Sequence, residues 1–289
     1  MFDFIQIVLS QIFPFIPLAY AVTISYNVLR ATDLTLDGSF VLGGGVYALL
    51  LTHNINPLLA AMAAIISGLI SGSIVGLIQR HNKIDALLAG ILACFMLSSV
   101  NLLIMGKPNI NLIGYDNYLS LLLDNKPNLG YLVIGALSVL SCAMVYLIIY
   151  SKIGLRLRAL GENQSLLMKL GYSSENYKVF GFALTNALAA ISGVLTTQCV
   201  GYADINMGLG MTLTGIAAII IGYQLLHRLS YRLKSINFEF ISSLAGVVIY
   251  FTAINLLLKF DVNPLYLKLF LSVILISFMR FSNIKKAPQ

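Results

Sequence analysis

Long uninterrupted apolar stretches are the feature that most constrains how this chain can fold. Nine occur, separated by short polar or glycine-containing segments: 4–29, 38–52, 57–78, 84–105, 129–150, 178–200, 209–223, 238–258 and 263–280. A helix needs about 20 apolar residues to cross a bilayer, and only 38–52 and 209–223 are clearly short. Continuous runs do not fit the alternating ten-residue strands of a membrane β-barrel. The sequence therefore predicts an all-α polytopic membrane protein with about eight to nine transmembrane helices.

The composition supports the same fold class. Only 10% of the 289 residues are charged and 58% are hydrophobic, whereas a soluble domain carries roughly 25% charged residues. The excess apolar surface must therefore face lipid, which excludes a cytosolic enzyme, a secreted disulfide scaffold and a disordered chain. The longest polar loops, 106–128 and 151–177, are too short to be domains. We expect residues 1–289 to form one membrane domain.

Positive charge is distributed unevenly between the loops. The net charge of +7 could indicate a nucleic-acid partner, but the basic residues do not gather on one soluble face, as such binding requires. They alternate with nearly charge-free loops, in four groups: Arg80 and Lys83; Lys152, Arg156, Arg158 and Lys169; Arg228, Arg232 and Lys234; Arg280, Lys285 and Lys286. Cytoplasmic loops carry such an excess. This pattern predicts an external N-terminus and a cytoplasmic C-terminus, provided that 38–52 crosses the membrane completely.

Residues for covalent chemistry are scattered. The cysteines lie inside apolar stretches without paired spacing, the histidines are far apart, and the glycine run 43–45 lacks the Lys-Ser or Lys-Thr of a phosphate-binding loop. These residues are Cys94, Cys142, Cys199, His53, His81 and His227. We expect no disulfide, no metal site, no bound cofactor and no enzymatic activity in this chain.

The stretch from Arg30 to Phe40 interrupts an otherwise apolar hairpin. It places Asp33 and Asp37 four residues apart, among hydroxyl residues and glycine. Charged groups near the membrane interior are costly unless they pair or line a cavity. One interpretation is a discontinuous second helix lining a translocation path, with Arg30 as a partner for one carboxylate. The other is a cytoplasmic turn in which an aspartate caps the next helix.

The segment 154–172 contains the signals of a short helix. Asn163 is a typical N-cap, Gly171 a typical terminator, and Leu166, Leu167 and Leu170 are expected on one face. A helix this short is marginal alone. It is either an amphipathic helix on the membrane surface or a docking helix that inserts an apolar ridge into a cytoplasmic partner.

Small residues recur at every fourth position of the third apolar stretch, as Gly68, Gly72 and Gly76. This spacing permits close approach of two helices. We expect the partner helix to lie in the same subunit rather than across a dimer.

Residues Gly154–Asn163, followed by Gly171-Tyr172 and the apolar run 180–193, resemble the cytoplasmic coupling loop of branched-chain-amino-acid-type ATP-binding-cassette permeases. The stretches 33–40, 87–109 and 201–211 are similar to a subfamily of uncharacterised or putative tryptophan/tyrosine permeases. Together the resemblance covers residues 18–280.

This resemblance implies the permease subunit of an ATP-driven, binding-protein-dependent importer in the bacterial inner membrane. Its partners would be a second permease copy, cytoplasmic ATPases that hold ATP and Mg, and an extracytoplasmic substrate-binding protein. The substrate would be a small solute, an amino acid of aromatic or branched-chain type. No nucleic-acid partner is expected.

The resemblance also assigns candidate residues. Those for the translocation path are Asp33, Thr35, Asp37, Ser39, Phe40, Asn186, Asp204, Met207 and Met211. Those for coupling to the ATPase are Arg158, Ala159, Gly161, Glu162, Asn163, Leu166, Leu167, Leu170 and Gly171. The competing hypothesis is an ion- or proton-coupled secondary transporter, in which Asp33 and Asp37 carry the proton.

Overall fold

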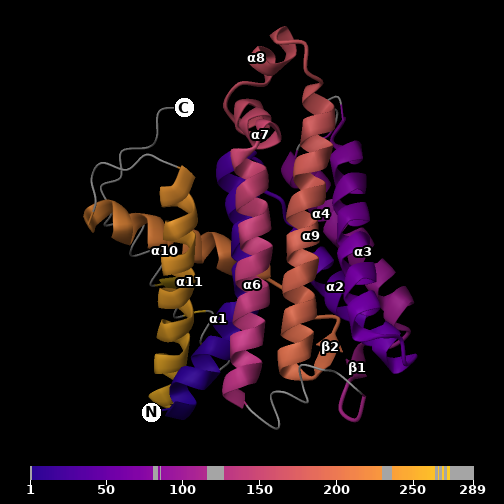
Figure 1. The fold of residues 1–289 in the computed structure, drawn as a ribbon, viewed down its shortest axis with the longest axis vertical. Coiled ribbons are helices and arrows are strands. Elements are labelled where there is room, and N and C mark those ends of the chain that lie inside the picture. Colours follow the sequence, from indigo (N-terminus) through magenta and orange to yellow (C-terminus); the bar gives the residue numbers. More distant parts are fainter. Residues whose placement is uncertain are drawn as a thin grey trace.

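The computed structural model describes residues 2–80, 84, 86–115, 127–229, 236–263, 266, 269 and 272–273. Within them, seven helices are long and apolar enough to cross a membrane, and a shorter apolar helix spans Met211–His227. The chain is therefore an all-α polytopic membrane protein, as the sequence predicts (Figure 1). The last predicted stretch, 263–280, lies mostly outside the described residues.

The described helices are α1 (Phe2–Thr23), the π-helical turn η1 (Ile24–Val28), α2 (Thr35–Thr52), α3 (Pro57–Ile78), α4 (Ala86–Met105), α6 (Pro127–Tyr150), α7 (Lys152–Glu162), α8 (Gln164–Lys169), α9 (Ser174–Val200), α10 (Met211–Leu229) and α11 (Ile236–Lys259). Two short strands, β1 (Asn109–Asn111) and β2 (Tyr202–Asp204), pair antiparallel. Most boundaries fall within a few residues of the predicted stretches, because apolar length is a local property of the sequence.

The helix α8 projects from one end of the bundle, and β1 and β2 lie at the other (Figure 1). We refer to these as the α8 end and the strand end. The N-terminus lies at the strand end, so α1 runs toward the α8 end and α2 returns. The orientation predicted from the charges of the loops requires this complete return by α2. At the α8 end, Arg80 is paired with Glu175 at 2.7 Å, which brings the first two predicted basic loops together. The C-terminal residues lie outside the described part.

The interruption predicted around residues 30–40 is present, but it precedes the second helix instead of dividing it. The helix α2 is continuous from Thr35 to Thr52. The break consists of η1 and the non-helical residues 29–34, with Arg30 at a positive φ of 51°. Gly161 of α7 lies against the carbonyl of Val28, where a Cβ would come within 2.0 Å. The helical conformation therefore ends at the point where α7 packs against η1.

The helix α9 is at the centre, packed on α1, α2 and α3. Its contact with α2 is so close that a Cβ on Gly193 would lie 1.9 Å from the Phe40 carbonyl oxygen. The predicted glycine stripe of α3 faces α9 in the same subunit, since a Cβ on Gly72 would lie 2.1 Å from the Phe182 carbonyl oxygen. The intrasubunit interpretation of that stripe is confirmed.

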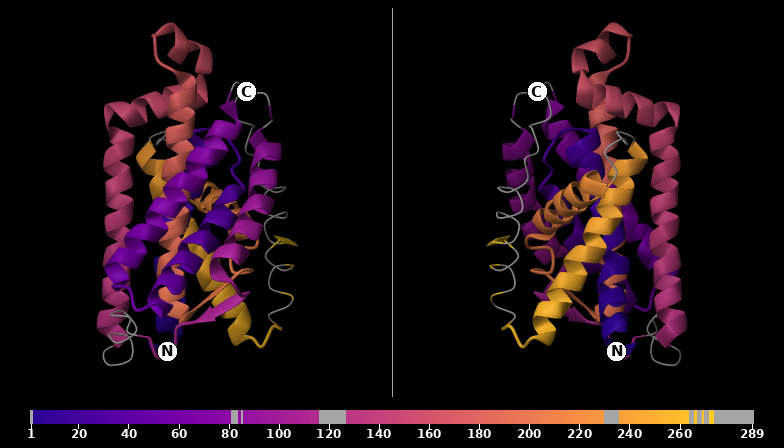
Figure 2. Two further views of the ribbon diagram at one scale, coloured as in Figure 1. Left: turned by 90° about the vertical axis from the view of Figure 1, so that its right-hand side faces the viewer. Right: turned by 90° about the vertical axis from the view of Figure 1, so that its left-hand side faces the viewer.

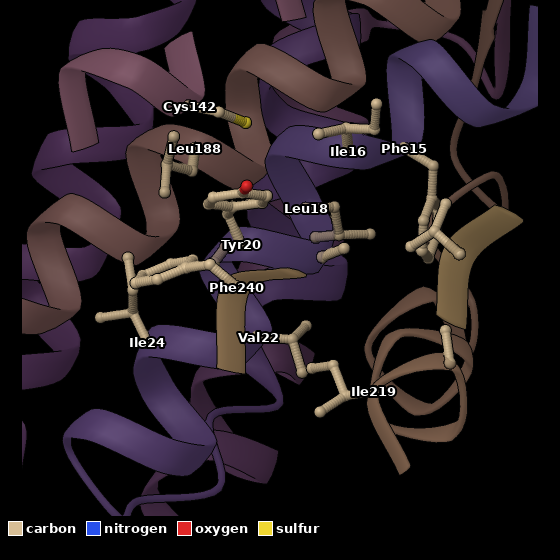
Figure 3. Packing of buried hydrophobic residues seen from close by; sticks show 14 of the residues in the cluster. Phe15, Ile16, Leu18, Tyr20, Val22, Ile24, Cys142, Leu188, Ile219 and Phe240 are labelled. Atoms are coloured by element: carbon tan, nitrogen blue, oxygen red, sulfur yellow. The ribbon is translucent and has the colours of Figure 1, made fainter. Parts of the chain in front are cut away.

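A second packing region joins α1, α6, α10 and α11 (Figure 3). The rings of Tyr20 and Phe240 stack with centroids 4.8 Å apart. The helix α10 is strongly inclined to the others (Figures 1 and 2) and crosses α11 at a mutual glycine contact. A Cβ on Gly222 or on Gly246 would lie 1.8 Å from a backbone oxygen of the opposite helix.

Candidate functional site

A hydrogen-bonded polar network is buried where α2, α3 and α9 meet. The amide oxygen of Asn186 accepts from Thr35 Oγ1 at 3.1 Å and from Ser39 Oγ at 2.7 Å. Its amide nitrogen donates to Asp33 Oδ2 at 3.0 Å and to the Phe182 carbonyl at 2.8 Å. Asn186 therefore uses both ends of its amide group to connect α9 with the start of α2.

The network continues on both sides of Asn186. Asp33 accepts from the Thr35 backbone N–H at 3.0 Å and also from the Thr35 hydroxyl, so it binds the first residue of α2 from the position before the N-cap Leu34. Ser39 lies 2.7 Å from Ser71 of α3. The structure thus agrees with the capping interpretation in part: Asp33 binds the first N–H of α2 but precedes the N-cap residue Leu34, and the cytoplasmic position of this turn stays a prediction. The described hydrogen bonds and ion pairs do not include the predicted pairing with Arg30.

The network is sealed from solvent within one chain. Asp33 is 1% exposed, and Thr35, Ser39, Phe40 and Asn186 are completely buried. Burial raises the pKa of the Asp33 carboxyl, and the hydrogen bonds from Thr35 and Asn186 lower it in part. In this conformation the five residues hold helices together rather than presenting their side chains to an open space.

Asp37 connects α2 to α10. One carboxylate oxygen accepts from the Thr212 backbone N–H and the Thr212 hydroxyl, both at 2.6 Å, and the other accepts from the Gly210 N–H at 2.9 Å. The first N–H groups of a helix have no intrahelical acceptor, and a negative charge is favourable there. Asp37 therefore caps α10 from another helix.

Replacing Asp37 with alanine is expected to destabilise the first turn of α10 by about 2 kcal/mol, the upper range for loss of a helix cap. Asp37→Asn should cost less, because one amide oxygen can still accept from Thr212. Hydrogen exchange at residues 211–215 measures the effect directly. Equal protection in Asp37→Ala and the unmodified chain would contradict the capping role.

The remaining predicted path residues lie toward the strand end or at the start of α10. Asp204 accepts from the Asn109 side chain at 3.2 Å and from the Asn206 N–H at 2.7 Å, so it organises the loop after β2. The Met207 sulfur lies 4.0 Å from the Thr197 hydroxyl. Met211 opens α10 and packs against the core around α1. These residues are separate from the network around Asn186.

The predicted short helix is present as α8. The side chain of Asn163 accepts from the Leu166 N–H at 3.1 Å and is the N-cap, as predicted. Gly171 has a φ of 80° and follows the C-cap Leu170, which confirms it as the terminator. The expected common leucine face is wrong: Leu167 is 1% exposed, whereas Leu166 is 49% and Leu170 is 62% exposed. Leu167 anchors α8 to the body, and the other leucines point away.

The other predicted coupling residues on α7 contact different parts of the protein. Arg158 donates to the Ile149 carbonyl of α6 at 2.8 Å. Gly161 contacts the backbone of η1, and the backbone oxygen of Ala159 accepts from the Asn163 N–H at 2.8 Å. Glu162 is exposed at the end of α7. Arg158 and Gly161 thus support the permease body itself.

Several residues that form these contacts between helices have no clear signal in the sequence. Ser71 lies next to Gly72 of the glycine stripe, and the stripe indicated close packing but not a hydrogen bond. Thr212 binds Asp37 from 175 residues away. Arg156 contacts Tyr172 and Tyr177, although none of the three stood out beyond charge or motif position.

Comparison with known proteins decides the family. Residues 4–279 match the family model described as the permease component of the branched-chain amino acid transport system. The chain belongs to this family. It is therefore a multi-pass membrane permease component of an ATP-binding-cassette-type transport system, which agrees with the resemblance of the coupling loop.

Individual relatives of the permease cover most of its length. An uncharacterised protein of Rickettsia prowazekii is 40% identical over 96% of this chain and 96% of that protein. A tyrosine transport system permease protein of Clostridioides difficile is 31% identical over 92% of this chain and 87% of that protein. A ribose import permease protein of Escherichia coli is 23% identical over 66% and 60%, respectively.

Proposed function

We propose that this permease is the membrane-spanning subunit of an ATP-driven importer of an amino acid. ATP and Mg bind to a separate cytoplasmic ATPase, which docks on α8, and a substrate-binding protein delivers solute at the strand end. The permease itself binds no cofactor. The observation that carries this proposal is the exposed apolar surface of α8 beyond the helix bundle.

The exposed apolar surface of α8 supports binding of a protein partner. Leu166 and Met168 on α8 are 49% and 53% exposed, and the C-cap Leu170 is 62% exposed. The helix projects past the ends of the spanning helices (Figure 1). Apolar side chains gathered outside the bilayer typically mark an interaction site. The α8 end also carries the first two predicted basic groups, Arg80 and the group from Lys152 to Lys169. This supports a cytoplasmic location for the α8 end in the bacterial inner membrane, and we propose that the C-terminus is on the same side.

The transport path is proposed to run between this chain and a second copy. Four of the polar residues first expected to line a path, Asp33, Thr35, Ser39 and Asn186, are sealed inside the subunit. A homodimer is the economical assembly for one permease sequence. In it, Asp33, Thr35, Ser39, Phe40 and Asn186 would hold the helices that flank the path. Asp37 and Met211 would set the position of α10, and Asp204 and Met207 would shape the outer mouth.

The substrate class is proposed from the relatives. The family description names branched-chain amino acid transport, and one relative is named for tyrosine. We therefore propose an amino acid, with tyrosine as the first candidate. Uptake of radiolabelled tyrosine and leucine by cells expressing the complete transporter tests this choice.

Replacing Leu170 with aspartate is expected to lower the ATPase recovered with the purified permease at least about tenfold, because burial of one leucine side chain is worth about 1.5–3 kcal/mol. The control is Ile113→Asp at the strand end, where Ile113 is 81% exposed. It should leave ATPase recovery unchanged. Gly161 is a poorer test residue, because its substitution would disturb the contact with η1.

Two outcomes would overturn the proposal. One is unchanged ATPase recovery with Leu170→Asp. The other is full uptake by the purified permease alone in vesicles, driven by an ion gradient and abolished by an uncoupler. That second result would favour the secondary-transporter hypothesis with Asp33 and Asp37.

A further inference from the structure

The helix α7 forms a crossbar between the end of α6 and the α8–α9 hairpin (Figure 2). It packs on α6, α9 and η1, and the side chain of its own Leu157 is completely buried. Arg156 and Arg158 lie two positions apart, so they project from opposite flanks of the helix. Arg158 reaches α6, where its guanidinium donates to the Ile149 carbonyl and lies 5.5 Å from the Tyr150 ring centroid.

Arg156 points away from α6 and contacts two tyrosines, Tyr172 and Tyr177. One terminal nitrogen donates to the Tyr177 hydroxyl in the first turn of α9, and the other donates to the Tyr172 hydroxyl at 3.1 Å. The guanidinium carbon lies 4.0 Å from the Tyr172 ring centroid. The two rings meet edge to face, with centroids 6.2 Å apart. We call Arg156, Tyr172 and Tyr177 the tyrosine clamp.

The clamp acts where the chain leaves α8. The chain leaves α8 through Gly171, which has a positive φ and open space around it. Tyr172 follows immediately in the chain. Its hydrogen bond and ring contact with Arg156 therefore determine the direction of the chain after α8. The other attachments of α8 to the body are few: the buried Leu167 and the hydrogen bond from the Gln164 side chain to Ser174 at 3.2 Å.

The geometry requires arginine in particular. A guanidinium presents several N–H donors in a rigid plane and can stack on a ring while it donates to two hydroxyl groups. The described part of the chain has an ion pair between Arg80 and Glu175 at 2.7 Å. Among the described residues, no carboxylate forms such an ion pair with Arg156. The clamp is therefore held by directed hydrogen bonds and stacking, which a lysine would reproduce only in part.

We infer that Arg156 is a positioning residue that fixes α8 rigidly to α9, so that displacement of α8 by the ATPase moves α9. The helix α9 carries Asn186, which is bonded to the start of α2. Movement of α9 would therefore reach the α2 network directly. This inference rests on the proposed function for its role in coupling, but not for the geometry of the clamp.

The first test measures the pose of α8 in the permease alone. Spin labels at Met168→Cys on α8 and Phe180→Cys on α9, with the native cysteines replaced by alanine, report the distance between the helices. Arg156→Ala should broaden the distance distribution about twofold, because a restrained segment gains freedom. Arg156→Lys and Tyr177→Phe should give intermediate widths. Arg158→Ala is the matched control and should leave the width unchanged, since Arg158 is bonded to α6.

The second test measures coupling in the complete transporter with its ATPase. Arg156→Ala should retain ATPase recovery, because the exposed leucines of α8 are unchanged. The substrate imported per ATP hydrolysed should fall about tenfold, since two hydrogen bonds to a charged group are lost, with partial rescue by Arg156→Lys.

An unchanged distance distribution in Arg156→Ala would overturn the clamp, whatever the protein transports. A broadened distribution with an unchanged ratio of import to hydrolysis would overturn its role in coupling. Failure of the unmodified permease to bind any ATPase would instead overturn the proposed function, and the distance measurement would still decide the clamp.

Discussion

Replacing Asn186 with leucine is expected to lower the free energy of unfolding by about 3–5 kcal/mol, because several buried polar groups lose a partner and each such loss costs about 1–3 kcal/mol, more where the group is a carboxylate. Leucine has the same γ-branched shape as asparagine but a larger volume, so part of the loss comes from overpacking, and a second buried asparagine is needed as a control for that part. It removes the donor to Asp33 and the acceptor for Thr35 and Ser39, all in a region closed to water. Unfolding of the purified permease in detergent, followed by its midpoint temperature, measures the effect.

Asn255 provides the matched control. It is also buried, at 4% exposure, and its amide nitrogen donates to Gln11 and to the Phe251 carbonyl at 2.8 Å. It contacts no carboxylate through these bonds, so Asn255→Leu should cost only about 1–3 kcal/mol, the penalty for unsatisfied neutral groups. Equal losses in the two variants would show that Asp33 is not the origin of the Asn186 effect.

Replacing Gly193 with alanine is expected to cost about 3 kcal/mol, the upper part of the usual range for overpacking a core. The added Cβ would lie 1.9 Å from the Phe40 carbonyl oxygen and 3.1 Å from the Gly44 nitrogen. Both are backbone atoms of α2, so no side-chain rotation can relieve the contact. The helices α2 and α9 would have to separate, which would also strain the network around Asn186.

The control for this prediction is Gly135→Ala in α6. There the added Cβ would meet ring carbons of Phe13 at 3.2–3.3 Å, and a ring can shift by a few tenths of an ångström. Alanine also favours a helix by about 1 kcal/mol over glycine, so little net change is expected. Comparing the monodisperse fraction and melting midpoint of the two variants tests the argument, which fails if Gly193→Ala is as stable as Gly135→Ala.

The spanning helices and the short helix were predictable because their signals are local. The bilayer requires a minimum apolar length, so the stretches mark the helices regardless of their neighbours. Asn163 and Gly171 delimit α8 because a cap and a terminator act on the adjacent backbone. The stripe Gly68, Gly72 and Gly76 likewise indicated a close helix contact before its partner was known.

The side-chain partners were not predictable, because they depend on how each helix is rotated and placed against the others. Asp33 and Asn186 are 153 residues apart, and Asp37 and Thr212 are 175 apart. Composition could only say that two aspartates near a membrane need partners. It could not distinguish a path lining from a sealed connection between helices.

The sequence by itself determined that this chain crosses a membrane several times and carries a capped two-turn helix in a polar loop, since length, hydropathy and capping act between neighbouring residues. Only the tertiary structure decided that Leu167 is buried while Leu166 and Leu170 are exposed, that Asp37 caps α10, and that Arg156 donates to Tyr172 and Tyr177. Burial and hydrogen bonding between helices depend on their relative rotation. Packing of the whole chain sets that rotation, and no single segment encodes it.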